Sequence, residues 1–335
     1  MGHVLNNTIQ DVLVRKARME GKNTLWLPGT DHASIATETK VVQMLREQGI
    51  KKSDISRDEF LKHAYEWKEK YGGIIIKQLK KLGCSCDWSR EQFTMDKAYS
   101  HAVLNAFVKL YKDGMIYQGK RIIHWDPEGL TALSDEEVIY KETKSHLWHF
   151  KYPIKDSSDF LIVATTRPET MLGDSGIAVN PKDKRYSKYI GQTAILPIVD
   201  REIPIFSDEY VDMEFGTGCV KVTPAHDPND FAMASRNNLE IINIMHPDAT
   251  LNENVPKDYQ GLDRYQARKK VVNHLDSLQL VEKIDDYVHN VGYSERTDAV
   301  VEPYLSKQWF LNMKPFAKEA LKSVDKKHIQ FYPNK

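Results

Sequence analysis

The sequence predicts a mixed α/β protein with two parts of different character. The first part reads as helix, strand and helix, the order found in an open sheet of parallel strands. The second part, from about residue 146, has short strand-like runs separated by Gly and Pro, which is typical of a compact β-rich domain with few helices. Because no strand pattern precedes the first helix, we expect the chain to start inside the first unit.

The helices of the first part follow from apolar spacing and capping signals. Four apolar side chains share one face of the first predicted helix, and Gly21 follows where a C-terminal cap belongs. Ser56 and Glu59 have the spacing of a capping box, which opens a long third helix. We predict helices at residues 3–20, 33–48, 57–82 and 96–113.

The strands are predicted from short apolar runs. Residues 24–27 have a buried-strand pattern, and Pro28-Gly29 then turns the chain toward the second helix. Residues 116–150 read as short strands and loops, and the pattern from about residue 287 onward is irregular. In between, we predict strands at 161–164, 194–198, 203–206 and 219–222, the middle two as a pair, and a helix at 262–278.

The composition is that of a globular protein large enough for two domains. Of its 335 residues, 41% are hydrophobic and 28% are charged, and Lys plus Arg equals Asp plus Glu at 47 each. The zero net charge gives no support for a nucleic-acid partner, so any such surface must be local. Two basic groups supply either such a surface or a solvated helix face: Arg264, Arg268, Lys269 and Lys270, and Lys77, Lys80 and Lys81.

The cysteines and the apolar runs indicate the compartment. Three cysteines do not make a disulfide framework, and they suggest a reducing environment. Cys84 and Cys86 lack a second ligand pair, so we expect no zinc site. No apolar run is long enough to span a bilayer, and the N-terminus has no signal pattern. We therefore expect a cytoplasmic protein without membrane attachment.

Two polar residues of the first part stand where ligands bind in an open α/β sheet. His3 is at the start of a helix, whose N–H groups and dipole attract phosphates. Asp31 follows the predicted strand, and the carboxyl ends of strands form the ligand-binding edge. The alternative is structural, with Asp31 as a helix cap and His3 satisfied by its neighbours.

Hydroxyl groups surround a guanidinium directly after the predicted strand at 161–164. The run contains Thr165, Thr166, Arg167 and Thr170, and together these side chains can bind a phosphate or a ribose through hydrogen bonds. The alternative is a polar turn that leads into the next helix.

A later segment gathers charged side chains beside two glycines that permit close backbone approach. Lys221 and Thr223 alternate with valines, so both point to one face of a strand. Asp227 and Asp230, three residues apart at a helix start, can face one pocket. A metal site with His226 is a poor interpretation, because no second ligand cluster has suitable spacing, and no nucleophile–base pair stands out.

Together, these segments resemble the class I aminoacyl-tRNA synthetases of the valine type. Met1-Gly2-His3 looks like the end of the HIGH signature of that family. The loop at 164–170 and the segment at 216–230 match the editing domain inserted in these enzymes. Further motifs similar to the family's lie at 27–33, 35–37, 86–91, 93–96 and 301–310, so that the resemblance covers the whole chain.

The resemblance implies a partial Rossmann-type (HUP-like) nucleotide-binding domain interrupted by a β-rich α+β editing domain. We expect 1–145 to be the first part of the catalytic domain with connective helices, 146–286 the editing domain, and 287–335 the return toward the second half of the catalytic domain. The strand before His3 and a Lys-Met-Ser-Lys-Ser-like loop are missing from the sequence. We therefore expect an incomplete gene or a fragment that does not activate valine alone.

The resemblance also implies an activity for the complete enzyme. Such an enzyme uses ATP with Mg²⁺ to join L-valine to tRNA(Val). His3 would contact the ATP phosphates, and Asp31 would bind the ammonium group of valine. We expect the protein to be a monomer.

Editing is implied because threonine and valine are nearly isosteric. A hydrophobic pocket cannot strongly reject an isostere with an added hydroxyl, a limit known for the valine enzyme itself. Asp230 would hold the ammonium of mischarged threonyl-tRNA(Val), while Asp227 and Lys221 read its hydroxyl. Water would hydrolyse the ester without a metal or cofactor. The remaining substrate-binding residues would be Thr165, Thr166, Arg167, Thr170, Thr223 and, as a pocket wall, Phe215.

Two alternatives stay open. An isoleucine-type enzyme resembles this chain but lacks the lysine and the first aspartate of the segment at 221–227, and it would prefer to hydrolyse valyl-tRNA. A non-catalytic tRNA-binding remnant would bind tRNA in a salt-dependent way without deacylating it. Ser34 and Glu38 also differ from the usual Gly and Gln of the family.

Overall fold

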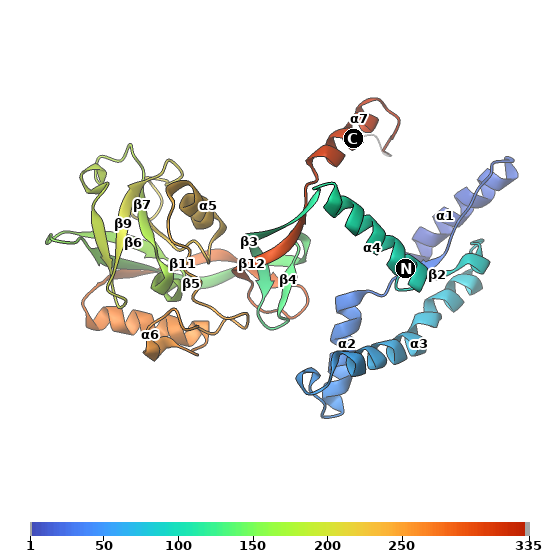
Figure 1. The fold of residues 1–335 in the computed structure, drawn as a ribbon, viewed down its shortest axis with the longest axis horizontal. Coiled ribbons are helices and arrows are strands. Elements are labelled where there is room, and N and C mark those ends of the chain that lie inside the picture. The colour runs from blue at the N-terminus through green and yellow to red at the C-terminus, as the bar shows by residue number, and fades with distance from the viewer. Residues whose placement is uncertain (1, 332–335) are drawn as a thin grey trace. The chain divides into compact units, whose positions relative to one another are not determined.

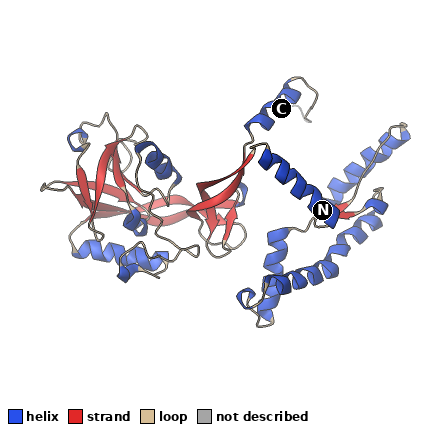
Figure 2. Cartoon of the chain, viewed as in Figure 1, coloured by secondary structure: helices blue, strands red, loops and turns tan. Residues whose placement is uncertain are grey.

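The computed structural model describes residues 2–331, so Met1 of the signature-like start and residues 332–335 fall outside the described range. The chain forms two compact units. The helical unit comprises Met1–Tyr117 with Leu311–Lys335, and the strand unit comprises Gln118–Phe310. Figure 1 labels the elements, and Figure 2 shows helices dominating the first unit and strands the second. No helix within residues 2–331 is long and apolar enough to cross a membrane.

The helical unit confirms the four predicted helices. The Ser56–Glu59 capping box is present at the start of α3, and Gly83 ends that helix with a φ of 87°. Helix α2 buries Val41 and Leu45 and packs against α3. The helices are α1 (Gly2–Met19), α2 (Ser34–Glu47), α3 (Arg57–Leu82), α4 (Lys97–Lys112) and α7 (Lys314–Asp325). The last of these lies in the region that was expected to be irregular.

The strand predicted at 24–27 is wrong. Residue Trp26 accepts one backbone hydrogen bond, from the Asp87 N–H, but a strand forms only further along, where β1 (Gly29–Thr30) lies parallel to β2 (Gln92–Phe93). The chain before β2 forms the short 3-10 helix Trp88–Arg90, which cannot continue a β-ladder back toward residue 24. The apolar side chains at 24–27 therefore have the composition of a strand, but this segment has no neighbouring strand with which to form a ladder.

The strand unit contains three sheets. Their strand orders are β10-β7-β9-β8, β11-β5-β6 and β12-β3-β4. The predicted strands and the predicted pair of β8 with β9 are confirmed. The strands are β3 (Ile116–Asp126), β4 (Thr131–Leu133), β5 (Val138–Pro153), β6 (Phe160–Thr165), β7 (Gly176–Val179), β8 (Thr193–Leu196), β9 (Arg201–Ser207), β10 (Cys219–Val222), β11 (Val281–Ser294) and β12 (Glu302–Leu311).

One hydrophobic core joins the first two sheets and α6. Inward-facing residues of β5 alternate along the strand, and Phe150 and Tyr152 are completely buried. Helix α6 (Arg264–Ser277), which confirms the predicted helix, contributes buried Ala267, Val271 and Leu275 on one face. Helix α5 (Pro228–Asn237) starts directly after β10 and its loop. The core thus fixes the strands and helix starts that carry the polar residues described below.

The longest strands were not predicted. Residues 116–150 were expected to be short strands and loops, but β5 alone has 16 residues, and β11 has 14 instead of turning irregular after 287. The two strands pair along nearly their whole length. Their outer halves carry polar and exposed residues on both faces, so neither shows the apolar alternation from which a strand is predicted.

The predicted edges of the inserted domain fall inside this β5–β11 ribbon. His146 pairs with Asp286, so the boundaries at 145/146 and 286/287 meet at one point of the ladder. The compact strand unit is wider, from Gln118 to Phe310. Compactness does not decide where an insertion begins, and the domain boundaries stay a prediction.

Candidate functional site

A cavity of about 760 Å³ in the strand unit collects the predicted polar residues of that part. Its walls are the β5–β11 ribbon, the loop after β6, β10 with the start of α5, the first two turns of α6 and the start of β12. All nine predicted editing residues line it: Thr165, Thr166, Arg167, Thr170, Phe215, Lys221, Thr223, Asp227 and Asp230. The structure therefore brings together side chains that are up to 65 positions apart, whereas their individual roles stay predictions.

The Lys221 ammonium is buried and fully committed. Its Nζ lies 3.0 Å from Asp174 Oδ1, 3.0 Å from Thr170 Oγ1 and 2.5 Å from Thr223 Oγ1. These three contacts use all three N–H donors of a lysine. Lys221 thus holds two hydroxyls in place and has no donor left for a ligand.

The hydroxyls that Lys221 holds are also committed as donors. Thr223 donates its proton to Asp174, and Thr170 donates to the Arg167 carbonyl at 3.0 Å. A threonine hydroxyl has one proton and two lone pairs, of which Lys221 uses one. The remaining capacity of Thr170 and Thr223 is therefore one acceptor lone pair each.

Asp174 is the member of this network that the sequence analysis missed. It is completely buried, its Oδ1 accepts from Lys221 and Thr223, and its Oδ2 accepts from the Tyr152 hydroxyl at 2.7 Å. Burial and the nearby Asp174 charge raise the pKa of Tyr152 well above its ordinary value. A carboxylate within the stretch at 171–179, which contains no other charged residue and is mostly apolar, was the signal that could have identified it.

Two aspartates form the acidic end of the cavity. Asp227 caps α5, its Oδ1 accepting the N–H groups of Asn229 and Asp230 at 2.8 and 3.1 Å. Asp230 is 8% exposed, and its Oδ2 accepts the Thr223 N–H at 2.8 Å. Burial, and then the charge of Asp227, raise the pKa of Asp230 to about 7. The Asp230 Oδ1 has no hydrogen-bond partner within residues 2–331.

His226 is a second residue whose place the sequence did not reveal. It is 2% exposed and lines the cavity, and its Nε2 accepts the Ile244 N–H at 3.1 Å. Burial, then the charges of Arg167 and Lys221, lower its pKa to about 3, so the ring is neutral at physiological pH. Because Nε2 is an acceptor, Nδ1 carries the hydrogen, and among the described residues this buried donor has no partner.

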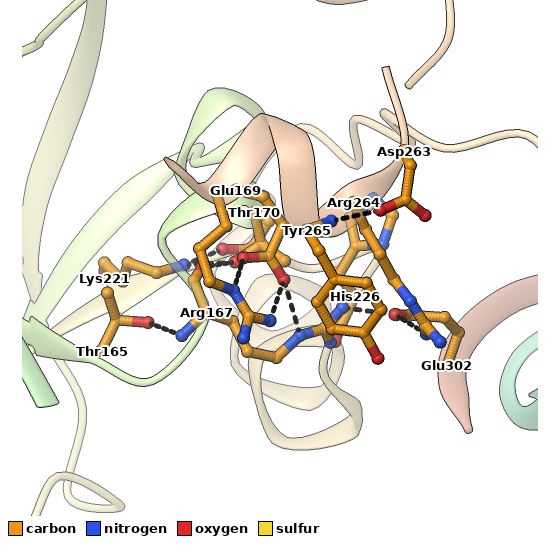
Figure 3. A network of polar contacts seen from close by, with 12 residues as sticks. Thr165, Arg167, Glu169, Thr170, Lys221, His226, Asp263, Arg264, Tyr265 and Glu302 are labelled. Atoms are coloured by element: carbon orange, nitrogen blue, oxygen red, sulfur yellow. Dashed lines mark hydrogen bonds and ion pairs between the residues drawn. The ribbon is translucent and has the colours of Figure 1, made fainter. Parts of the chain in front are cut away.

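Arg167 belongs to a cluster of three arginines and two buried glutamates, of which Figure 3 labels Arg167, Arg264, Glu169 and Glu302. It pairs with Glu302 and, at 3.3 Å, with Glu169, and it donates to the His226 carbonyl at 3.3 Å. Burial opposes its charge, but the charges of Glu302 and Glu169 outweigh burial and raise the pKa of Arg167. These contacts hold the Arg167 side chain in a fixed position in the wall of the cavity.

The remaining predicted residues of the cavity, Thr165, Thr166 and Phe215, differ in exposure. Thr165 accepts the Arg167 N–H at 3.0 Å, and Thr166 is half-buried beside it. Phe215 is 60% exposed, in a loop closed by Gly216 and Gly218. A Cβ on Gly218 would lie 2.6 Å from the Arg185 side chain, and its φ of 77° also requires glycine. The two glycines thus set the position of Phe215.

The predicted residues of the helical unit are not brought together. Asp31 lines a cavity of about 970 Å³ between α2, α3 and β2, but its side chain is 76% exposed. Its Oδ1 accepts the Ala33 N–H at 2.8 Å and lies 3.4 Å from His32 Nδ1. His3 lies exposed in the first turn of α1 and does not line this cavity. Across residues 2–331, no three His, Cys, Asp or Glu side chains are grouped to hold a metal ion.

Comparison with known proteins places the chain in context. Residues 1–335 match the family described as tRNA synthetases class I (I, L, M and V). The valine–tRNA ligase of Porphyromonas gingivalis is 55% identical over 336 residues, and that of Parabacteroides distasonis is 56% identical over 335 residues. Each match covers 100% of the chain, which spans 38% of the length of these relatives.

Among solved structures, the chain is similar to the LeuRS of the ternary LeuRS-tRNA-LeuAMS complex from Agrobacterium radiobacter K84. That match covers 86% of the chain and 42% of the LeuRS chain, at 19% identity and a TM-score of 0.34. A TM-score this low supports no conclusion about the site.

Proposed function

The chain belongs to the class I tRNA synthetases of the isoleucine, leucine, methionine and valine group, and we propose that it is the part of a valine–tRNA ligase that edits mischarged tRNA. The complete enzyme would use ATP to join L-valine to tRNA(Val). The cavity of the strand unit would hydrolyse threonyl-tRNA(Val), with the reactive ester placed between the acidic end and the arginine cluster.

The observation that carries the proposal is the hydrogen-bonding capacity left in the cavity. Lys221 has no donor to spare, and Thr170 and Thr223 can only accept. The Asp230 Oδ1 also accepts, so this end of the cavity takes donors. An amino acid with an ammonium group and a hydroxyl supplies them, whereas valine in the same place has the ammonium but would leave the acceptor of the hydroxyl unpaired.

This capacity changes the role predicted for Lys221. It acts at one remove, by orienting the hydroxyls of Thr170 and Thr223, and it does not read the substrate hydroxyl itself. The ammonium of the substrate goes to Asp230, and its hydroxyl donates to Asp227 or Thr223. The His226 Nδ1–H is a neutral donor suited to an oxygen of the ester or of the terminal ribose.

The reaction is then an ester hydrolysis. Water adds to the carbonyl carbon, the bond to the ribose oxygen breaks, and the products are threonine and a tRNA with a restored hydroxyl. Holding the ester rigidly by its ammonium and its ribose lowers the entropic part of the barrier. The exposed Phe215 would cover the terminal adenosine.

The helical unit would contribute to valine activation in the complete enzyme. The first turn of α1 carries His3 and no acidic side chain, so its N–H groups suit an ATP phosphate. The exposed carboxylate of Asp31, in its own cavity, would bind the ammonium of valine. Mg²⁺ would accompany the nucleotide, and we propose a cytoplasmic, monomeric enzyme.

Deacylation of threonyl-tRNA(Val) and valyl-tRNA(Val) by the purified chain tests the editing proposal. We expect hydrolysis of the threonyl ester to exceed that of the valyl ester, and Asp230→Ala to lower kcat/KM for it about 100-fold or more, since a buried charged contact is lost. Asp276→Ala, which removes an exposed carboxylate from α6, is the matched control.

Three results would contradict the proposal. Preference for valyl-tRNA would favour an isoleucine-type editing site. Binding of tRNA without hydrolysis of either ester would favour a non-catalytic domain. Unchanged hydrolysis by Asp230→Ala would remove the assigned ammonium site.

A further inference from the structure

The first two turns of α6 present Arg264, Tyr265 and Arg268 to the cavity. Figure 3 shows Arg264 and Tyr265 on the side away from Lys221. We propose that Arg268 and Tyr265 form a subsite for single-stranded RNA, in which Arg268 binds a phosphodiester and Tyr265 stacks on a base of the segment that precedes the aminoacylated nucleotide. The inference rests on the proposed function for the identity of the RNA.

The cluster of three arginines and two glutamates to which Arg264 and Arg268 belong carries more positive than negative charge. Arg264 pairs with Glu302 at 2.5 Å, and Arg268 pairs with Glu169 at 2.7 and 2.9 Å. Arg167 shares both of these carboxylates, so three guanidinium groups face two carboxylates. Both glutamates are under 5% exposed and have no other charge partner within the described chain. A net charge of this kind in a largely buried cluster is stabilised by a bound anion.

Arg268 is the member of the cluster that can reach such an anion. Its side chain is 22% exposed, against 7% for Arg264. Arg167 is 26% exposed, but its Nε, Nη1 and Nη2 all have partners, whereas the pairing of Arg268 with Glu169 uses only Nε and Nη2. The Nη1 group has no hydrogen-bond partner within residues 2–331. A guanidinium held on one side by a carboxylate presents its other side in a fixed orientation, which suits a phosphate.

Tyr265 supplies the second half of the subsite. Its ring is 43% exposed, and the guanidinium groups of Arg264 and Arg268 lie 4.8 and 5.4 Å from its centroid. The Tyr265 backbone is fixed as well, because Asp263 accepts its N–H at 2.8 Å. An exposed ring next to a cation is the arrangement with which proteins bind single-stranded nucleic acid, through stacking and phosphate contacts together.

The whole cavity is therefore polar along its length. The aspartates attract an ammonium, and the arginine cluster attracts a phosphate. An aminoacylated RNA end carries both groups, on either side of the ester. The basic group at 264–270 is thus split: Arg264 and Arg268 face the cavity, whereas Lys269 is exposed and Lys270 donates to the Asp258 carbonyl.

Binding of an uncharged single-stranded RNA hexamer that ends in CCA tests the subsite without any hydrolysis. With the full chain, titrated over a range of salt concentrations, we expect Arg268→Gln to weaken binding about tenfold and to reduce the slope of log K against log salt by about 1. Tyr265→Ala should also weaken binding about tenfold, and Tyr265→Phe, which keeps the ring, should not. Arg268→Lys should keep most of the salt slope.

Lys269→Gln is the matched control, because it removes an exposed charge one position along the same helix. Equal weakening by Arg268→Gln and Lys269→Gln would overturn the subsite in favour of non-specific charge attraction, as would failure of the chain to bind the hexamer. If Arg268→Gln does not fold, the pair of Tyr265 variants decides the question. RNA binding with this mutational pattern but no threonyl-tRNA hydrolysis would support the subsite and contradict the proposed function. Hydrolysis of threonyl-tRNA without this pattern of RNA binding would support the proposed function and contradict the subsite.

Discussion

The two units differ in what holds their polar residues in place. In the strand unit, Asp174 is completely buried and Lys221 is 8% exposed at its side chain, and both are anchored beside a shared hydrophobic core. In the helical unit, the Asp31 side chain is 76% exposed, and α1, α4 and α7, all within the described range, bury no residue. Polar side chains are therefore held in fixed positions where they lie beside a hydrophobic core. Three predictions test this difference between the units.

The largest effect is expected from the buried charge pair. Asp174→Ala leaves the Lys221 ammonium buried without a counter-charge, which should lower the free energy of unfolding of the strand unit by about 3–5 kcal/mol. Asp31→Ala in the helical unit should change the free energy of unfolding by less than about 0.5 kcal/mol. Urea unfolding, with hydrogen exchange measured separately in each unit, gives both values. An equal decrease in the free energy of unfolding for both variants would show that the two carboxylates contribute equally to stability.

A smaller effect is expected from the pH dependence of Asp230. Its pKa of about 7 in the folded chain lies above the ordinary value of 3.8, so the folded state binds more protons between about pH 4 and 7. Stability should therefore fall as the pH rises through this window. Asp230→Asn removes the penalty, and we expect it to be more stable than the parent by up to about 4 kcal/mol at pH 8, the equivalent of the pKa shift, and by nothing at pH 4.

Thermal or urea unfolding at several pH values measures this difference. Asp276→Asn, at an exposed position of α6, is the control and should follow the parent at every pH. If the stability of the parent rises between pH 4 and 7, and Asp230→Asn is no more stable than the parent at pH 8, the surroundings of Asp230 do not disfavour its ionised form.

The smallest effect is expected at the helix caps. Ser56→Ala in α3 and Asp263→Ala in α6 each remove a side-chain cap and should cost about 1 kcal/mol. Helix α6 is anchored by four buried residues, but α3 buries only Ile76. Hydrogen exchange should therefore spread further along α3 than along α6. Identical fraying in both helices would show that core anchoring does not limit it.

The elements that local chemistry determines could be predicted from the sequence. The Ser56 capping box and the Gly21 and Gly83 ends locate the helices, because capping depends on neighbours within a few positions. The polar residues of the cavity were also identifiable, since they cluster in two short segments. The false strand at 24–27 and the unrecognised length of β11 have the opposite cause, because strand pairing depends on a partner far along the chain.

The chemistry of single side chains depends even more on distant contacts. That Lys221 has no donor to spare follows only from the meeting of Asp174, Thr170 and Thr223 around it. The neutral state of His226 follows from its burial and from the Ile244 N–H. A sequence shows which groups are present, but the satisfied or unsatisfied state of each group is a property of the packed structure.

The facing of Ser145 and Tyr287 across the β5–β11 ladder has a consequence for the modularity of the chain. The segment between these two positions begins and ends on neighbouring, paired strands. Such a segment can be excised and its flanks rejoined by a tight turn, or grafted onto another hairpin, without altering the distance that the host must span. The exchange would separate Arg167 and Arg264 from Glu302, which lies beyond Tyr287, so a graft that keeps the cavity must also carry the start of β12.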